Sequence, residues 1–239
     1  MTGPMDNAPA RKVDALLFDK DGTLFEFSAT WDPWAHGVIE ELTAGDAALA
    51  GRLAEAMHYD LAARRFHPTS PIIAGTNREA AECVATALPG RAIDELEVFL
   101  AARASTAPLS APVPLAPFLD GLAMQGLALG VMTNDAESSA LAQLETAGIT
   151  RWFGFIAGFD SGHGAKPAPD PLLAFARAMQ LAPDRVAMVG DSTHDLIAGR
   201  AAGMQTIAVL TGTATTAELL PHADVVLDHI GHIPAWLQE

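Results

Sequence analysis

The stretch Val13-Asp14-Ala15-Leu16-Leu17-Phe18-Asp19-Lys20-Asp21-Gly22-Thr23-Leu24 decides the fold of this chain. Its first half is apolar and long enough for one buried strand, and it ends in two carboxylates and a glycine. Asp19 and Asp21 are two residues apart, so in an extended chain their side chains point to the same side and Lys20 points away. Two such close carboxylates favour one that attacks or binds a cation and one that keeps its proton.

Composition narrows the class of protein. The chain has 239 residues, half of them hydrophobic, and a formal net charge of -15, which argues against nucleic acid and anionic membrane surfaces as partners. Its one cysteine, Cys83, rules out an internal disulfide, fits a reducing compartment and is expected in the core. No apolar run reaches the ~18 residues of a membrane span, and no signal-peptide core is seen, so we expect a cytoplasmic protein, monomeric or homodimeric. Residues 1–12 are expected to be a flexible N-terminus.

Residues 29–112 have a helical texture rich in Ala, Leu and Glu. Apolar spacing predicts four helices and no strand, at 31–42, 46–63, 78–88 and 93–104. Between the second and third lies a non-helical segment, residues 64–76. It is either a plain connecting loop or a segment over a pocket that contacts the leaving part of a substrate, with Arg65, Ser70 and Thr76 as candidates. A proline-rich return segment predicts closure of this insert about hinges near Ala29 and Pro112.

From residue 113 onward strands and helices alternate, which predicts an α/β fold with a parallel sheet. Three more strand or loop ends carry polar groups. Thr133 and Asn134 follow an apolar strand, and Lys166 precedes a helix, where a cation makes sense if it faces an anion. Asp191 ends a further strand and Asp195 follows inside the next helix. Each alone is also consistent with an ordinary helix cap or surface residue.

Taken together and in order, these residues resemble the four motifs of the haloacid dehalogenase-like superfamily. Asp-Lys-Asp-Gly-Thr resembles motif I, Thr133 motif II, Lys-Pro-x-Pro at Lys166 motif III, and Gly-Asp-x-x-x-Asp at Asp191 motif IV. The branch that the motifs resemble most is the phosphoglycolate phosphatase-like one. The resemblance implies a Rossmann-like parallel sheet core, residues 13–28 and 113–239, with an inserted all-α helical cap domain, residues 29–112.

The resemblance also implies a chemistry. Asp19 would attack phosphorus to form an aspartyl-phosphate, and Asp21 would protonate the leaving alkoxide and then activate water. Thr133, Asn134 and Lys166 would hold the phosphoryl oxygens. The implied function is a phosphatase acting on a small phosphorylated metabolite, with 2-phosphoglycolate as the first expectation.

The implied cofactor is Mg²⁺, held by Asp19, the Asp21 carbonyl and Asp191, with Asp195 supporting the metal-bound water or the lysine. Hard oxygen ligands of this kind suit Mg²⁺. His194 lies within the last motif, where we expect a solvated helix position.

Relatives with other chemistry supply the alternatives. A β-phosphoglucomutase-like phosphosugar mutase keeps the same four motifs and stays open. A haloacid dehalogenase would not need the acid at Asp21. A phosphonoacetaldehyde hydrolase needs a cap lysine, and no lysine occurs between Lys20 and Lys166. A receiver domain places its phosphate-accepting aspartate on a different strand.

Overall fold

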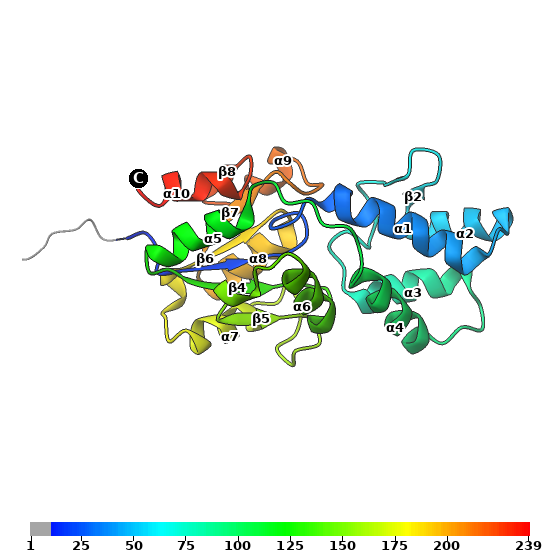
Figure 1. Ribbon diagram of the computed structural model, residues 1–239, viewed down its shortest axis with the longest axis horizontal. Coiled ribbons are helices and arrows are strands. Elements are labelled where there is room, and N and C mark those ends of the chain that lie inside the picture. The colour runs from blue at the N-terminus through cyan, green and yellow to red at the C-terminus, as the bar shows by residue number, and fades with distance from the viewer. Residues whose placement is uncertain (1–10) are drawn as a thin grey trace, which may run out of the picture.

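A computed structural model describes residues 11–239 of the chain. The predicted flexible N-terminus therefore lies almost wholly outside the described residues. Figure 1 shows two parts side by side: a sheet with helices packed on it, and a group of four helices, α1–α4, that lies beyond one end of the sheet. The chain passes into the helical group directly after the first strand and returns from it before α5.

The sheet contains six strands in the order β5-β4-β1-β6-β7-β8, and every neighbouring pair is parallel. The first strand is central, with Ala15 opposite Ala128 on one side and Val186 on the other. The strands are β1 (Ala15–Phe18), β4 (Ala128–Met132), β5 (Phe155–Ala157), β6 (Val186–Gly190), β7 (Gln205–Val209) and β8 (Val225–Leu227). The predicted α/β parallel sheet is thus confirmed.

Alternation along the first strand gives the core its two layers. Leu16 and Phe18 pack in one apolar cluster with α5 and α10, whereas Ala15 and Leu17 pack in another with α7 and α8. All four side chains are fully buried. The helices of the core are α5 (Leu115–Met124), α6 (Glu137–Thr146), α7 (Asp170–Ala178), α8 (Thr193–Ala202), α9 (Thr216–Leu219) and α10 (Ile233–Trp236), with 3₁₀ turns at Thr150–Trp152, Pro183–Arg185 and Ile230–His232.

The inserted helices have an apolar cluster of their own, which includes Trp34, Leu53, Val84 and Leu96. They are α1 (Phe27–Thr43), α2 (Ala47–Met57), α3 (Asn77–Ala87) and α4 (Ile93–Ala104). We use "cap" for these helices and the segments that join them. The sequence boundaries of the cap and its hinges remain predictions.

The prediction of an insert without strands is wrong at one place. β2 (Tyr59–Asp60) and β3 (Arg65–Phe66) pair as a short antiparallel hairpin where the second helix was expected to continue to residue 63. That helix ends at Met57, because His58 adopts a left-handed conformation. Tyr59 is buried, stacks edge-on against Phe66 at 5.3 Å and donates its hydroxyl to the Asp32 carbonyl, so packing overrides the helical spacing.

Two further expectations need correction. α1 begins at Phe27 rather than near Trp31, with Pro33 inside the helix instead of in its first turn. Cys83 is only partly buried, because the core side of α3 is taken by Ala80, Val84 and neighbouring alanines. Among residues 11–239, no helix combines the length and the apolar character that crossing a bilayer requires.

Candidate active site

The carboxyl ends of three adjacent strands meet in the middle of the sheet. Asp19 directly follows β1, Thr133 follows β4, and Asp191 follows β6, and these two strands flank β1 on either side. The chain order reverses direction across β1, which is the switch point where parallel sheets bind ligands. The sequence therefore brings its polar strand ends into one small region.

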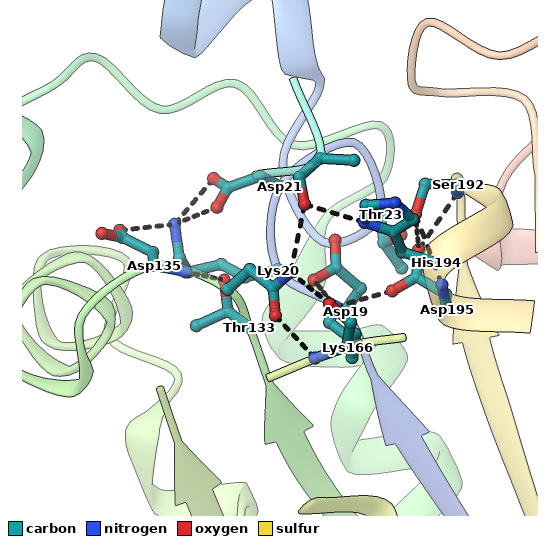
Figure 2. A network of polar contacts seen from close by, with 12 residues as sticks. Asp19, Lys20, Asp21, Thr23, Thr133, Asp135, Lys166, Ser192, His194 and Asp195 are labelled. Atoms are coloured by element: carbon teal, nitrogen blue, oxygen red, sulfur yellow. Dashed lines mark hydrogen bonds and ion pairs between the residues drawn. The ribbon is translucent and has the colours of Figure 1, made fainter. Parts of the chain in front are cut away.

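Lys166 links the acidic groups of this region. Its ammonium donates to Asp19 Oδ1 at 2.5 Å and to Asp195 Oδ1 at 2.6 Å, and all three side chains are buried (Figure 2). Asp195 is held in turn, because its Oδ2 accepts from the Ser192 amide at 3.0 Å and the Ser192 hydroxyl at 2.7 Å. The lysine is thus fixed by two carboxylates at the edge where an anionic substrate would enter.

Three carboxylates form a compact group that would suit a cation. Asp19, Asp191 and Asp195 each offer one oxygen, and these oxygens lie within 4.8 Å of one another. Burial raises the pKa of Asp19 to about 7, despite the opposing attraction of Lys166. Burial, with repulsion from Asp19 and Asp195, raises the pKa of Asp191 well above its usual value. One ammonium does not balance this much buried negative charge.

Burial acts in the opposite direction on the lysine. By itself burial lowers the pKa of the Lys166 ammonium, but the attraction of Asp19 and Asp195 more than offsets it, so the pKa lies above its ordinary value. Lys166 is therefore a permanent positive charge in this site.

Gly22 explains how the first motif can approach the fourth. Its φ is 82°, a left-handed conformation, and a side chain there would collide with the Asp191 carboxylate. The neighbouring Thr23 is fully buried and donates its hydroxyl to Asp191 Oδ1 at 3.4 Å. The Asp-Gly-Thr sequence thus allows the β1 loop to pack against the end of β6.

Asp21 does not share the orientation of Asp19, contrary to the expectation from their spacing. Its carboxylate turns toward Lys20 and Asp135, on the opposite side from Asp195 in Figure 2. The Lys20 ammonium lies 2.6 Å from both Asp21 oxygens and 3.4 Å from Asp135 Oδ2. Lys20 itself lies outside the cavity lining, as the spacing predicted. Its ion pair with Asp21 was not expected, and it forms because the chain has already left the strand at these positions.

Lys20 also joins the core to the cap. It is fully buried and donates to Gln143 Oε1 at 2.5 Å, and the Gln143 amide donates to the Ala104 carbonyl at the end of α4 at 2.7 Å. Burial alone lowers the pKa of Lys20, but the attraction of Asp21 and Asp135 raises it above the usual value. A continuous series of polar contacts therefore runs from the candidate acid, Asp21, through Lys20 and Gln143 to a cap helix.

The two residues after β4 have different contacts. Thr133 Oγ1 accepts from the Asp135 amide at 3.1 Å, so its own proton is available for an acceptor in the cavity. Asn134 uses both amide hydrogens on carbonyls, those of Lys166 at 2.9 Å and Ala74 at 3.0 Å, and accepts from the Lys166 amide. Its side chain therefore positions the lysine loop and leaves no N–H for the phosphate contact that the sequence suggested.

A cavity lies between these residues and the cap. We call its core wall the residues Asp19, Asp21, Thr133, Asn134, Asp135, Lys166, Asp191, Ser192, His194 and Asp195, and its cap wall the residues Phe27, Trp31, Trp34, Ile72, Ile73, Ala74, Gly75, Thr76, Asn77 and Ala80. The walls touch at the Ala74 carbonyl, which accepts from Asn134 and lies 3.0 Å from His194 Nδ1. His194 is therefore partly buried at this contact rather than solvated as expected.

Of the three cap candidates, only Thr76 lines the cavity. Arg65 is exposed and paired in the hairpin, outside the cavity lining. Ser70 is buried, but its hydroxyl donates to the Met57 carbonyl at 2.7 Å, so it stabilises the loop fold. The expectation of polar substrate contacts at these two positions is wrong, since hydrogen-bonding residue types alone do not show which side of a loop faces the pocket.

The sequence reasoning missed the apolar part of the cap wall. Phe27, Trp31 and Trp34 recur on one face of the first cap helix at spacings of three and four. That spacing also describes an ordinary core-facing stripe, and only the position of the helix over the sheet edge distinguishes the two.

Comparison with known proteins agrees with the geometry. A model of the haloacid dehalogenase-like hydrolase family matches residues 13–203. The phosphoglycolate phosphatase of Escherichia coli K12 is 37% identical over 98 residues, which cover 41% of this chain and 39% of that protein. The phosphoglycolate phosphatase of Salmonella paratyphi A is 33% identical over 115 residues, or 48% and 46%. These matches span less than half of either relative.

Solved structures share the fold at low sequence identity. A predicted phosphoglycolate phosphatase from Haemophilus somnus 129pt superposes with a TM-score of 0.70 at 18% identity, over 94% of this chain and 98% of that one. CbbY from Rhodobacter sphaeroides, solved in complex with phosphate, superposes with a TM-score of 0.68 at 21% identity, over 95% and 100%. With the family match over residues 13–203 and the four motifs at one edge of the sheet, the chain belongs to the haloacid dehalogenase-like hydrolase family.

Proposed function

We propose that this protein is a Mg²⁺-dependent phosphatase that hydrolyses a small phosphate monoester through an aspartyl-phosphate on Asp19. The observation that carries the proposal is the buried group of Asp19, Asp191, Asp195 and Lys166 at the switch point of the sheet. A fixed cation beside a nucleophilic carboxylate is what transfer of a dianionic phosphoryl group needs. A dehalogenase acting on a carbon substrate would not need an acid at Asp21 or the Lys20 ammonium that holds it.

The first half of the reaction forms one bond and breaks another. Asp19 attacks phosphorus, the phosphorus–oxygen bond to the alcohol breaks, and Asp21 donates its proton to the leaving alkoxide. Lys166 and Thr133 bind the phosphoryl oxygens and stabilise their charge during transfer. Asn134 keeps Lys166 in place through the two backbone contacts of that residue.

In the second half, Asp21 takes a proton from water and the water oxygen attacks phosphorus. Asp19 leaves as a free carboxylate, and inorganic phosphate is released. For both steps Asp21 must turn from Lys20 toward Asp19, a rotation of one side chain that already lines the cavity. Lys20 provides the position to which the carboxylate returns.

The donor set fits Mg²⁺, which prefers oxygen ligands and one or two carboxylates with water. Asp19 and Asp191 would hold it with the Asp21 carbonyl, and Asp195 would orient its water ligands and Lys166. The ion would neutralise the buried negative charge of the group and polarise the phosphoryl oxygens.

The test is phosphate release from a panel of esters, with Mg²⁺ and with chelator, in the wild type and in Asp19→Asn. The panel includes 2-phosphoglycolate, because two partial relatives carry that activity in their names, together with sugar phosphates and nucleoside monophosphates. Release that requires both Mg²⁺ and Asp19 supports the proposal. Isomerisation of a sugar phosphate without phosphate release would instead support the mutase alternative.

A further inference from the structure

We infer that the cap wall selects an ester whose leaving alcohol is uncharged and has an apolar face, so that a carboxylate-bearing ester such as 2-phosphoglycolate is a poor substrate. This inference rests on the proposed phosphatase function and names its substrate class. It follows from the charges, the rings and the hydrogen-bonding groups that line the cavity on the cap side.

Among the residues that the structure describes, the cavity lining has no free side-chain cation for a second anionic group. Within residues 11–239, Lys166 is the only lysine or arginine in the cavity lining, and it is already shared between Asp19 and Asp195. Five aspartates line the same cavity. The Lys20 ammonium lies outside the lining, fully buried and also held by Asp135 and Gln143, and Arg65 lies outside the lining too. A substrate carboxylate would therefore add charge to a site that is already acidic.

The start of α3 does not supply an anion site either. Thr76 and Asn77 begin this helix at the cap wall, where backbone N–H groups would ordinarily attract an anion. Here the Glu79 carboxylate already occupies the end, accepting from the Thr76 amide at 2.7 Å and the Thr76 hydroxyl at 3.0 Å. A substrate carboxylate at this helix end would be repelled by the Glu79 carboxylate.

His194 is committed to the junction of the walls. A carbonyl oxygen can only accept, so Nδ1 of His194 carries the hydrogen that bonds Ala74. The ring therefore holds the cap segment through Nδ1.

The same wall is well suited to an apolar face. Trp31 and Trp34 pack edge to face with their centroids 5.1 Å apart, and Phe27 lies 6.5 Å from Trp31. Ile72 and Ile73 complete this side of the cavity and are partly exposed. Flat rings and sugar faces gain contact area on such a surface without a compensating charge.

Asn77 adds a polar group to the cap wall. Its Nδ2 donates one of its two hydrogens to the Glu97 carbonyl at 2.9 Å, and no residue in 11–239 donates a hydrogen bond to its Oδ1. A hydroxyl on the leaving group can donate to this oxygen and accept from the second Nδ2 hydrogen, whereas an ionised carboxylate can only accept. Because the described lining also has no free side-chain cation, the cap wall favours a neutral alcohol over an acid of similar size.

The experiment uses pairs of esters in which one leaving alcohol is uncharged and the other carries a carboxylate. We expect kcat/KM to be higher by about tenfold or more for 2-hydroxyethyl phosphate than for 2-phosphoglycolate, and for benzyl phosphate than for 4-carboxybenzyl phosphate. Benzyl phosphate should also exceed ethyl phosphate, because it offers a ring. Equal or higher kcat/KM for the carboxylate member of both pairs overturns the inference.

A gain-of-charge variant gives a second test. Ile73→Lys adds an ammonium at a partly exposed position of the cap wall and should raise the relative kcat/KM of each carboxylate ester by about fivefold. Ile73→Met, matched in length and uncharged, should keep the wild-type ratio. A ratio that moves equally in both variants would mean that shape, and not charge, sets the selection.

Binding separates failure of the inference from failure of the proposed function. If no ester releases phosphate in an Asp19-dependent manner, the proposed function fails. The inference is then decided by calorimetric titration of the same esters into the Asp19→Asn protein with Mg²⁺. Tighter binding of the uncharged members upholds it, and tighter binding of the carboxylate members contradicts it.

Discussion

The two walls of the cavity differ in almost every physical property. The core wall has five aspartates, one lysine and a threonine, which lie at or just beyond the carboxyl edge of the sheet. Short hydrogen bonds join Lys166 to Asp19 and Asp195. The cap wall is mostly aromatic and aliphatic, with no lysine, arginine, aspartate or glutamate in the lining that residues 11–239 provide. The difference supports our proposal that the core performs the chemistry and that the cap selects the alcohol that leaves.

The largest expected effect comes from the core wall. Asp19→Asn removes the proposed nucleophile while keeping the shape of the side chain, and kcat should fall by about three orders of magnitude or more for every ester. Steady-state phosphate release measures this, with the thermal midpoint as a control for folding. A loss confined to one ester would break the assignment of chemistry to the core wall.

Lys20→Met is expected to have the next largest effect, because it removes the contacts that link Asp21 on the core wall to Gln143 and, through it, to the cap. It leaves Asp21 and Asp135 without their buried cation, so unfolding free energy should drop by about 3 kcal/mol. Loss of the Asp21 resting position should also lower kcat by about tenfold with little change in KM.

Lys12→Met is the matched control, since Lys12 is partly exposed and its ion pair with Glu239 spans 3.6 Å. Its effect on stability should stay within about 0.5 kcal/mol. If Lys20→Met and Lys12→Met lost similar amounts of stability and kept the wild-type kcat, Lys20 would have no role in positioning Asp21.

Metal binding should stabilise the core wall and leave the cap wall unaffected. At Mg²⁺ concentrations about 100 times Kd the protein should gain about 2.7 kcal/mol, seen as a rise in thermal midpoint that EDTA reverses. Asp191→Asn should abolish the rise, and Ile73→Met, on the cap wall, should keep it. A Mg²⁺-dependent rise that survives in Asp191→Asn would place the ion elsewhere.

The smallest effect lies at the opposite end of the sheet. Asp14 and Arg185 pair just before β1 and β6, with contacts of 2.8 and 3.0 Å, and this hydrogen bond from Arg185 lowers the pKa of Asp14. A lowered folded pKa gives stability above the unfolded value, which is lost as the pH falls through the folded value.

Arg185→Met should therefore lower the urea midpoint slightly at pH 7 and by nothing at a pH below the folded pKa of Asp14, with kcat unchanged. Both side chains are about one-third exposed, so solvent screens the pair. A change in kcat would show that the amino ends of the strands take part in the chemistry.

Much of the core wall could be predicted from the sequence because Asp19, Thr133 and Asp191 each directly follow a strand. An apolar run predicts a strand, and parallel strands have their carboxyl ends at one edge of the sheet. The sequence alone therefore predicts that Asp19, Thr133 and Asp191 lie at that edge. The direction in which each side chain turns cannot be predicted from the strand pattern. The pairing of Lys20 with Asp21 depends on Asp135 and Gln143, which are over a hundred positions away and give no local signal.

Most residues of the cap wall could not be predicted from the sequence. Ser70 and Arg65 were predicted to contact the substrate because of their polar side chains. In the structure Ser70 donates to a backbone carbonyl and Arg65 is exposed to solvent. The aromatic residues of the first cap helix look the same in sequence whether they face a core or a cavity. The hairpin at Tyr59 was missed for the same reason, because burial and cross-strand contact with Phe66 outweigh a helical period.

The most direct test of the division between the walls compares one change on each with the same pair of esters. Thr133→Ser alters the core wall, and Ile73→Lys alters the cap wall. The measured quantity is the ratio of kcat/KM for benzyl and 4-carboxybenzyl phosphate. We expect Thr133→Ser to lower both values by the same factor and to keep the ratio, whereas Ile73→Lys should shift the ratio toward the carboxylate ester. A ratio that shifts in Thr133→Ser and stays fixed in Ile73→Lys would contradict this division.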